Sequence, residues 1–201
     1  MTFDAASGTW RATFGSNLLA NTFDVTITAT DNAGNISAGT TDILAVYTTA
    51  NGYVTGHAKM YPSAGDVLPI ALDTSNNPAN LVLGFANVTS PASGSFDMDY
   101  AVKKNQDEFS ISATSVSWVV VADSTHASIL GHGDLTKYVN GVKTIVQNVT
   151  VRFDIVLGAK GTPDQITIKI FNPGLNPNVD PPTYIMNDAD SVNGSNLMIH
   201  P

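Results

Sequence analysis

The sequence predicts an all-β protein whose main part is an antiparallel β-sandwich or jelly-roll-like domain. Only 13% of the residues are charged, so Ser, Thr, Asn and Gly must supply the polar surface, and these residues suit strands and turns better than long surface helices. Apolar and polar residues alternate in short segments, which Gly, Pro, Asn and Asp separate. No segment of about ten residues repeats its apolar side chains with the helical period.

The alternation defines two sets of strands. The first set covers residues 9–14, 22–30 and 41–47; within 22–30, Phe23, Val25 and Ile27 alternate with Thr and Asp. The second set covers residues 53–61, 80–88, 93–102, 108–112, 115–122, 126–135, 142–157, 165–171, 183–185 and 197–200. Small polar residues at 48–52 predict a linker between the two sets. We therefore expect an N-terminal part at 1–47 and a larger domain at 53–201.

Three connections between the strands carry local signals. Asn140-Gly141 predicts a tight hairpin, because a type I′ turn needs positive φ at both central residues. Four prolines in residues 172–182 predict an irregular loop. Residues 63–67 are the best helical segment of the chain, and we expect no more than a single turn there.

The N-terminal part carries a family resemblance. The segment FDVTITATDNAGN at positions 23–35 follows the SGTW motif at 7–10. Together they resemble the closing half of a bacterial immunoglobulin-like surface repeat, over about residues 8–47. Such repeats act as stalks in adhesins and large secreted enzymes. A full repeat has seven strands in roughly 80 to 100 residues, so this chain holds about half of one.

Residues 53–201 resemble a domain that follows choice-of-anchor P regions in bacterial surface proteins. The resemblance lies in Phe96–Tyr100, in the SWVVV run at 117–121 and in DQITIKIF at 164–171. It implies a secreted or cell-surface location. It offers no catalytic residues to transfer.

A partial repeat raises a physical problem. A few strands with one apolar face do not stand alone, and their free edges invite pairing. The apolar face could pack on the larger domain, another chain could supply strands, or the chain could begin within a domain. Supply by another chain would be self-association through strand edges.

Charge and composition exclude several classes of function. Nine basic residues stand against seventeen acidic ones, giving a net charge of -8, and no basic patch is present for nucleic acid. No run of about 18 apolar residues predicts membrane insertion. The chain lacks cysteine, which removes disulfides, thiolate metal sites and cysteine nucleophiles.

The sequence contains no recognisable catalytic group, and we expect a protein that is not an enzyme. His57, His126, His132 and His200 lack the spacing of metal-binding or catalytic motifs. Asp97 and Asp99 share one face of a strand, but their alternation with Phe96, Met98 and Tyr100 is better explained by exposure to solvent.

Two acidic clusters are candidates for calcium, the only cofactor the sequence suggests. Extracellular calcium sites use Asp, Asn and carbonyl oxygens from loops. The first candidate cluster is Asp31, Asn32 and Asn35, and the second is Asp188, Asp190 and Asn193. Turns in which Asp or Asn binds nearby backbone explain both clusters without an ion.

Exposed aromatic rings could bind sugar faces, and Tyr138 and Tyr184 are the candidate ligand-binding residues. The leading prediction is a structural or adhesive module that contacts an extracellular polymer or a neighbouring surface-protein domain. The alternatives are a carbohydrate-binding accessory module of a secreted polysaccharide-degrading enzyme and a strand-exchanged subunit of an extracellular filament.

Overall fold

The computed structural model describes residues 2–6, 9–11, 18–46, 52–75, 78–102, 106–159, 162–188 and 195–201. Within these residues the chain consists of β-strands, turns and loops, and no segment is helical. All strand pairs are antiparallel. The predicted all-β antiparallel class is therefore confirmed.

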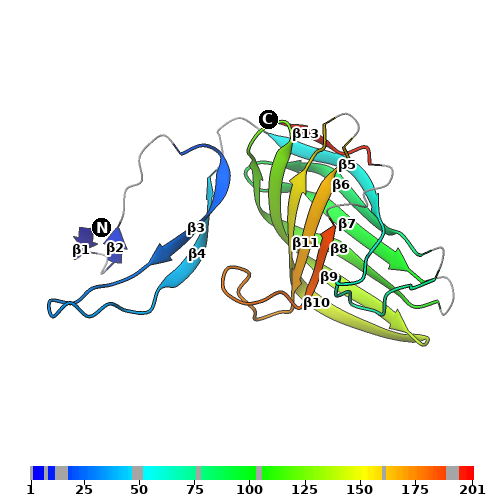
Figure 1. Cartoon of the computed structure of the whole chain (residues 1–201), viewed down its shortest axis with the longest axis horizontal. Helices are drawn as coiled ribbons and strands as arrows, with labels where there is room; N and C mark the ends of the chain where they lie inside the picture. The colour runs from blue at the N-terminus through cyan, green and yellow to red at the C-terminus, as the bar shows by residue number, and fades with distance from the viewer. Residues whose placement is uncertain are drawn as a thin grey trace.

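The N-terminal part forms two separate two-stranded sheets (Figure 1). In the first, β1 (Thr2–Asp4) pairs with β2 (Thr9–Arg11). In the second, β3 (Asn21–Ile27) pairs with β4 (Thr40–Val46), and we call this pair the ribbon. Both strands of the ribbon were predicted to within a few residues, whereas β1 carries too short a pattern to be recognised.

The larger domain is one sheet of nine strands, in the order β12-β11-β10-β9-β8-β7-β6-β5-β13. The strands are β5 (Tyr53–Met60), β6 (Leu81–Thr89), β7 (Ser93–Ala101), β8 (Glu108–Val121), β9 (His126–Val139), β10 (Val142–Val156), β11 (Gln165–Phe171), β12 (Tyr184–Asp188) and β13 (Met198–His200).

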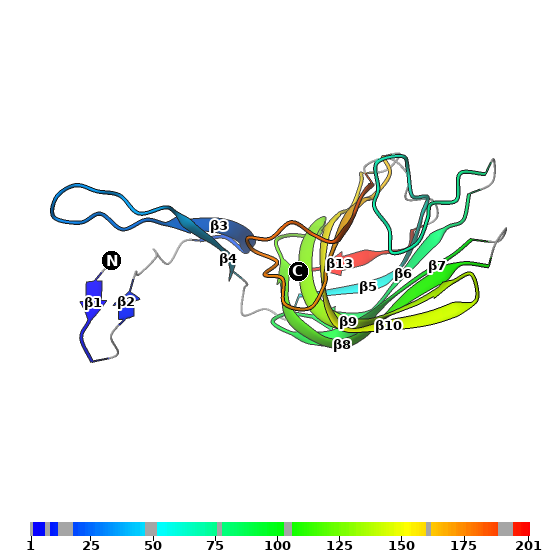
Figure 2. The ribbon, with the colours of Figure 1, turned by 90° about the horizontal axis from the view of Figure 1, so that it is seen from below.

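The connections of this sheet are those of a meander. Each strand from β5 to β12 pairs with the next one along the chain, and β13 returns to pair with β5. Figure 2 shows that the sheet curls strongly, so that its two halves face each other across the interior like the layers of a sandwich. The topology is thus simpler than that of a jelly roll, which needs Greek-key crossovers.

The concave face of the curled sheet encloses a filled apolar core. Alternate residues of every long strand point inward, as the two-residue period dictates. At its centre the ring of Phe153 meets the edges of Phe85 and Phe96, with centroids 5.1 and 5.0 Å away. Buried Leu83 and Ile168 belong to the same cluster. Because side chains fill the interior, the fold leaves its outer surface for contact with other molecules.

Glycines on β9 make room for this core. A β-carbon added to Gly131 would lie 2.6 Å from Cε1 of Phe96, and one added to Gly133 would lie 2.8 Å from Cγ2 of Ile111. Both distances are shorter than a van der Waals contact allows. The Gly131-His132-Gly133 motif therefore serves packing between β9 and the large side chains of β7 and β8.

The segment between β5 and β6 closes the open side of the curl. Val67 and Ile185 exchange backbone hydrogen bonds of 2.8 and 3.0 Å, which ties this segment to β12. Leu68 and Ile70 turn into the core beside this bridge. The single helical turn expected at 63–67 is absent; the amide of Ser63 donates instead to the carboxylate of Asp66 in a tight turn.

The ribbon lies against the outer face of β8. Val120 and Leu130 point away from the core, yet they are only 1% and 9% exposed. Both β3 and β4 contact β8, and Asn21 of β3 lines a small cavity together with Val120. Asn178, in the proline-rich loop after β11, donates a hydrogen bond to Asp42 of β4. These contacts join the ribbon to the larger domain.

Of the predicted linker at 48–52, only Gly52 lies among the described residues. Its carbonyl oxygen accepts a 2.8 Å hydrogen bond from the amide of Ser90, and a β-carbon added to it would lie 2.9 Å from Cβ of Val121. This end of the segment is fixed to the domain.

Candidate functional site

The candidate site is a groove on the outer face of the sheet, where β6, β7, β8 and β9 run side by side. Its volume is about 360 Å³. The side chains that give it chemical character are Asn80, Val82, Asp99, Glu108, Ser110 and Tyr138. Its size falls within the range typical of small-ligand sites.

Strand alternation and register bring these residues together. Residues with buried side chains, such as Tyr100 and Phe109, alternate with the outward residues of the groove. In one row across the sheet, Val82 faces Asp99, which faces Ser110. In the next row Ala101 faces Glu108, which faces Tyr138. The groove therefore combines side chains from four consecutive strands.

Negative charge dominates the groove. Burial raises the pKa of the Asp99 carboxyl above its usual range, and the nearby charges of Asp97 and Glu108 raise it further. Within the described part of the chain, neither Asp99 nor Glu108 forms an ion pair with a basic side chain. Residues 103–105, between β7 and β8, lie outside the described residues.

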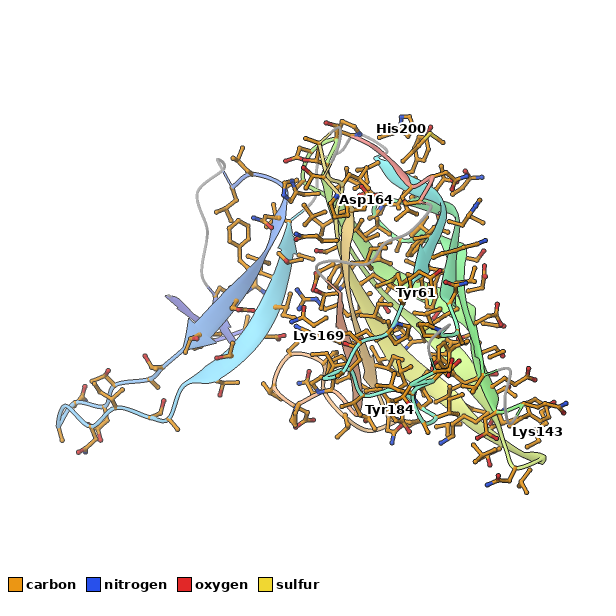
Figure 3. All side chains as sticks on the ribbon, turned by 45° about the vertical axis from the view of Figure 1, so that its right-hand side comes forward. Tyr61, Lys143, Asp164, Lys169, Tyr184 and His200 are labelled. Carbon is orange, nitrogen blue, oxygen red and sulfur yellow. The ribbon has the colours of Figure 1, made fainter. Side chains whose placement is uncertain are left out.

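Tyr138 forms one side of the groove and is half-buried. Its cross-strand neighbours are Glu108 on β8 and Lys143 on β10. The ammonium of Lys143 lies 5.6 Å from the ring centroid, the geometry of a cation–π contact. Figure 3 shows Lys143 near the far end of the β9–β10 hairpin. Lys143 and Glu108 thus lie on the two strands that flank Tyr138, and the tyrosine itself lines the groove.

Tyr184, the second predicted ligand-binding tyrosine, lies elsewhere. It is half-buried at the start of β12 and packs against the core cluster. Two strands, β11 and β10, separate β12 from β9 in the sheet order. Figure 3 shows Tyr184 well apart from Lys143, which neighbours Tyr138. The structure therefore does not bring the two tyrosines into one site.

Asp31 organises the turn between β3 and β4. One of its carboxylate oxygens accepts 2.9 Å bonds from the amides of Ala33 and Asn35, and the other accepts a 2.8 Å bond from the Asn35 side chain. These bonds, led by the one from the Asn35 side chain, lower the pKa of Asp31. Asn32 lies within the same exposed turn. The turn accounts for Asp31 and Asn35 without an ion, and no second carboxylate of the described segments joins them in a metal-binding group.

The second calcium candidate falls largely outside the described residues. Asp190 and Asn193 lie outside them, and Asp188 is described only as the backbone partner of Ile166. Among the residues that the structure describes, no group of three or more His, Asp or Glu side chains could hold a metal ion. Calcium binding at Asp188, Asp190 and Asn193 stays a prediction.

The histidines make separate local contacts. His126 lies 3.0 Å from Asp123 in the β8–β9 turn, where bonds from Thr125 and His126 lower the pKa of Asp123. The ring of His132 lies 3.2 Å from the hydroxyl of Thr150, and His200 stacks on Tyr53 at 4.4 Å. His57, on β5, is exposed.

The sequence pointed to Tyr138 but not to its partners. Asp99 was recognised as an outward residue, and its exposure beside buried Met98 and Tyr100 confirms that interpretation. Asn80, Glu108 and Ser110 carried no separate signal. The register between β7 and β8 would have joined them to Asp99, but residues 103–107 contain no hairpin motif that fixes this register.

The described residues contain no apolar helix long enough to cross a membrane. Comparison with protein families, curated proteins and solved structures finds no match to this chain. The groove therefore has to be interpreted from its own chemistry.

Proposed function

We propose that this protein is a non-catalytic adhesive module of a secreted or cell-surface protein, and that its groove binds an extracellular polymer. The observation that carries the proposal is the groove itself. It lies on the outer face of a sheet, is bordered by Tyr138 and is open along the rows of short polar side chains on β7 and β8.

The filled core supports binding at the surface rather than inside the curl. A polymer needs a site that its chain can cross, and an outer groove meets this need while an enclosed cavity does not. The side chains of Ser110 and Val82 are short, so they leave space in the groove. Tyr138 provides a ring against which a flat apolar surface can pack. Asn80 and Ser110 offer neutral hydrogen-bonding groups to hydroxyls.

Co-sedimentation with insoluble polysaccharides tests the proposal. The purified chain is mixed with cellulose, chitin, chitosan or peptidoglycan, and the bound fraction is measured together with any release of soluble sugar. We expect retention on at least one polymer without release. Tyr138→Ala should abolish retention, whereas Tyr138→Phe, which keeps the ring, should preserve most of it. Retention that Tyr138→Ala leaves unchanged, or release of sugar, would contradict the proposal.

A second candidate function, a strand-exchanged filament subunit, is favoured by the ribbon. Neither β3 nor β4 pairs with a third described strand, so both outer edges of the ribbon are open to strand addition. Ile27 of β3 is 46% exposed, and Ile36 in the connection to β4 is 70% exposed. Light scattering over a concentration series tests this candidate: growth of oligomers supports it, and a strict monomer excludes it.

A further inference from the structure

The charge of the groove restricts which polymer it can hold, provided that the proposed function holds. Asp99 and Glu108 are diagonal neighbours on paired strands, since Asp99 faces Ser110 and Glu108 faces Ala101. Diagonal side chains on one face of a sheet lie within reach of a common ligand. A neutral or anionic polymer would bury these carboxylates without compensation, which is costly.

A third carboxylate adds to the negative charge of the groove. Asp97 is on the same face of β7, one row away, and its side chain lies over Gly84 of β6, where any larger residue would collide with it. Burial and mutual repulsion already disfavour the charge on Asp99. A ligand cation placed between Asp99 and Glu108 would relieve that repulsion, so the groove selects positive charge.

The neutral residues of the groove indicate which kind of molecule carries the positive charge. Tyr138 lines the groove as the cross-strand neighbour of Glu108, and its ring already contacts one ammonium group, that of Lys143. Asn80 and Ser110 also line the groove, and both can form hydrogen bonds with hydroxyl groups. An apolar ring face, several hydroxyls and an ammonium group occur together in an amino sugar. We propose that the groove binds amino-sugar units of a polysaccharide with free amines, with the ammonium held between Asp99 and Glu108 and the sugar ring against Tyr138.

Isothermal titration with two matched ligands tests this inference. Glucosamine hexamer and N-acetylglucosamine hexamer share one backbone, but only the first is cationic at about pH 6. We expect glucosamine hexamer to bind at least about tenfold more tightly, and added salt to weaken its binding. Asp99→Asn and Glu108→Gln should each reduce its affinity about five- to tenfold. Asp24→Asn, which removes the same charge from the distant ribbon, is the matched control and should leave the affinity unchanged.

The possible results separate this inference from the proposed function. Equal binding of the two hexamers, with loss in Tyr138→Ala, would overturn the amine assignment and leave a polymer-binding groove. Tighter binding of hexalysine than of glucosamine hexamer would overturn the sugar assignment. If neither hexamer binds but retention on an insoluble polymer still depends on Tyr138, only the amino-sugar inference is overturned. If neither hexamer binds and retention does not depend on Tyr138, both proposals are overturned. Cooperative melting of each variant at about pH 6, at a temperature no lower than that of the unaltered protein, would exclude misfolding as the cause.

Discussion

The carboxylate of Asp107 accepts a 2.8 Å hydrogen bond from the backbone amide of Asn140, across the ends of two neighbouring hairpins. Asp107 is only 6% exposed and precedes β8, while Asn140 occupies the tip of the β9–β10 hairpin with a φ of 52°. Gly141 follows with a φ of 77°, which gives the positive pair that the type I′ prediction required. This bond fixes the end of the sheet where Glu108 and Tyr138 face each other.

Replacing Asp107 by Ala should destabilise the domain. The Asn140 amide would lose its buried acceptor, a change that typically costs about 1–3 kcal/mol. Urea unfolding measures the loss, and Glu108→Ala, an exposed neighbour, should change the unfolding free energy by less than about 0.5 kcal/mol. Equal effects of the two substitutions would contradict a structural role for Asp107.

Gly131 and Phe96 should be coupled in stability. Gly131→Ala forces a methyl group against both the Phe96 ring and the carbonyl oxygen of Ser115, and should cost roughly 1–3 kcal/mol. Phe96→Leu withdraws the ring atom that would collide, so the double variant should lose less than the sum of the two single variants. A double-mutant cycle by chemical unfolding measures this coupling, and strict additivity would show that the two positions do not meet.

Asp99→Asn should stabilise the protein at neutral pH. Because the folded state raises the pKa of Asp99, its charged form opposes folding above that pKa, and the penalty disappears as the pH falls below the unfolded value of 3.8. For a partly exposed charge, the gain at about pH 7 is on the order of 0.2–1 kcal/mol. Melting temperatures of the two proteins should differ at about pH 7 and converge near pH ~3. A lower melting temperature for the variant at neutral pH would contradict this assignment.

The backbone amides of the ribbon should be less protected from hydrogen exchange than those of the nine-stranded sheet. It has one ladder of hydrogen bonds and open edges, whereas β9 is paired on both sides. Amides of Asn21–Ile27 should exchange with deuterium at least about tenfold faster than those of β9. Asn178→Ala, which removes the bond to Asp42, should accelerate exchange in β4 and leave β7 unchanged. Uniform protection across ribbon and domain would mean that they unfold as one unit.

The strands of the curled sheet were largely predictable from sequence because each alternates over several residues. The exception is β8, predicted as two strands at 108–112 and 115–122. It is one strand with register shifts between Ala113 and Ser115 and between Val116 and Trp118. A bulge interrupts alternation without ending a strand, so a local pattern cannot distinguish the two.

The order of the strands and the composition of the groove were not predictable in the same way. Period-two patterns give the face on which Asp99 or Tyr138 lies, but not the strand beside it. Placing Glu108 between Asp99 and Tyr138 requires the register of two hairpins, and only the β9–β10 hairpin carries a turn motif strong enough to set its register.

The central claim is that ligand binding occurs in the outer groove between β6 and β9. A titration with glucosamine hexamer, followed through the backbone amide resonances of the labelled protein, locates the site directly. We expect the largest shift changes at Asn80, Asp99, Glu108 and Tyr138, with the interior positions Phe153 and Ile168 unmoved. Changes centred on the Asp31 turn or on Tyr184, or no changes at all, would contradict the claim.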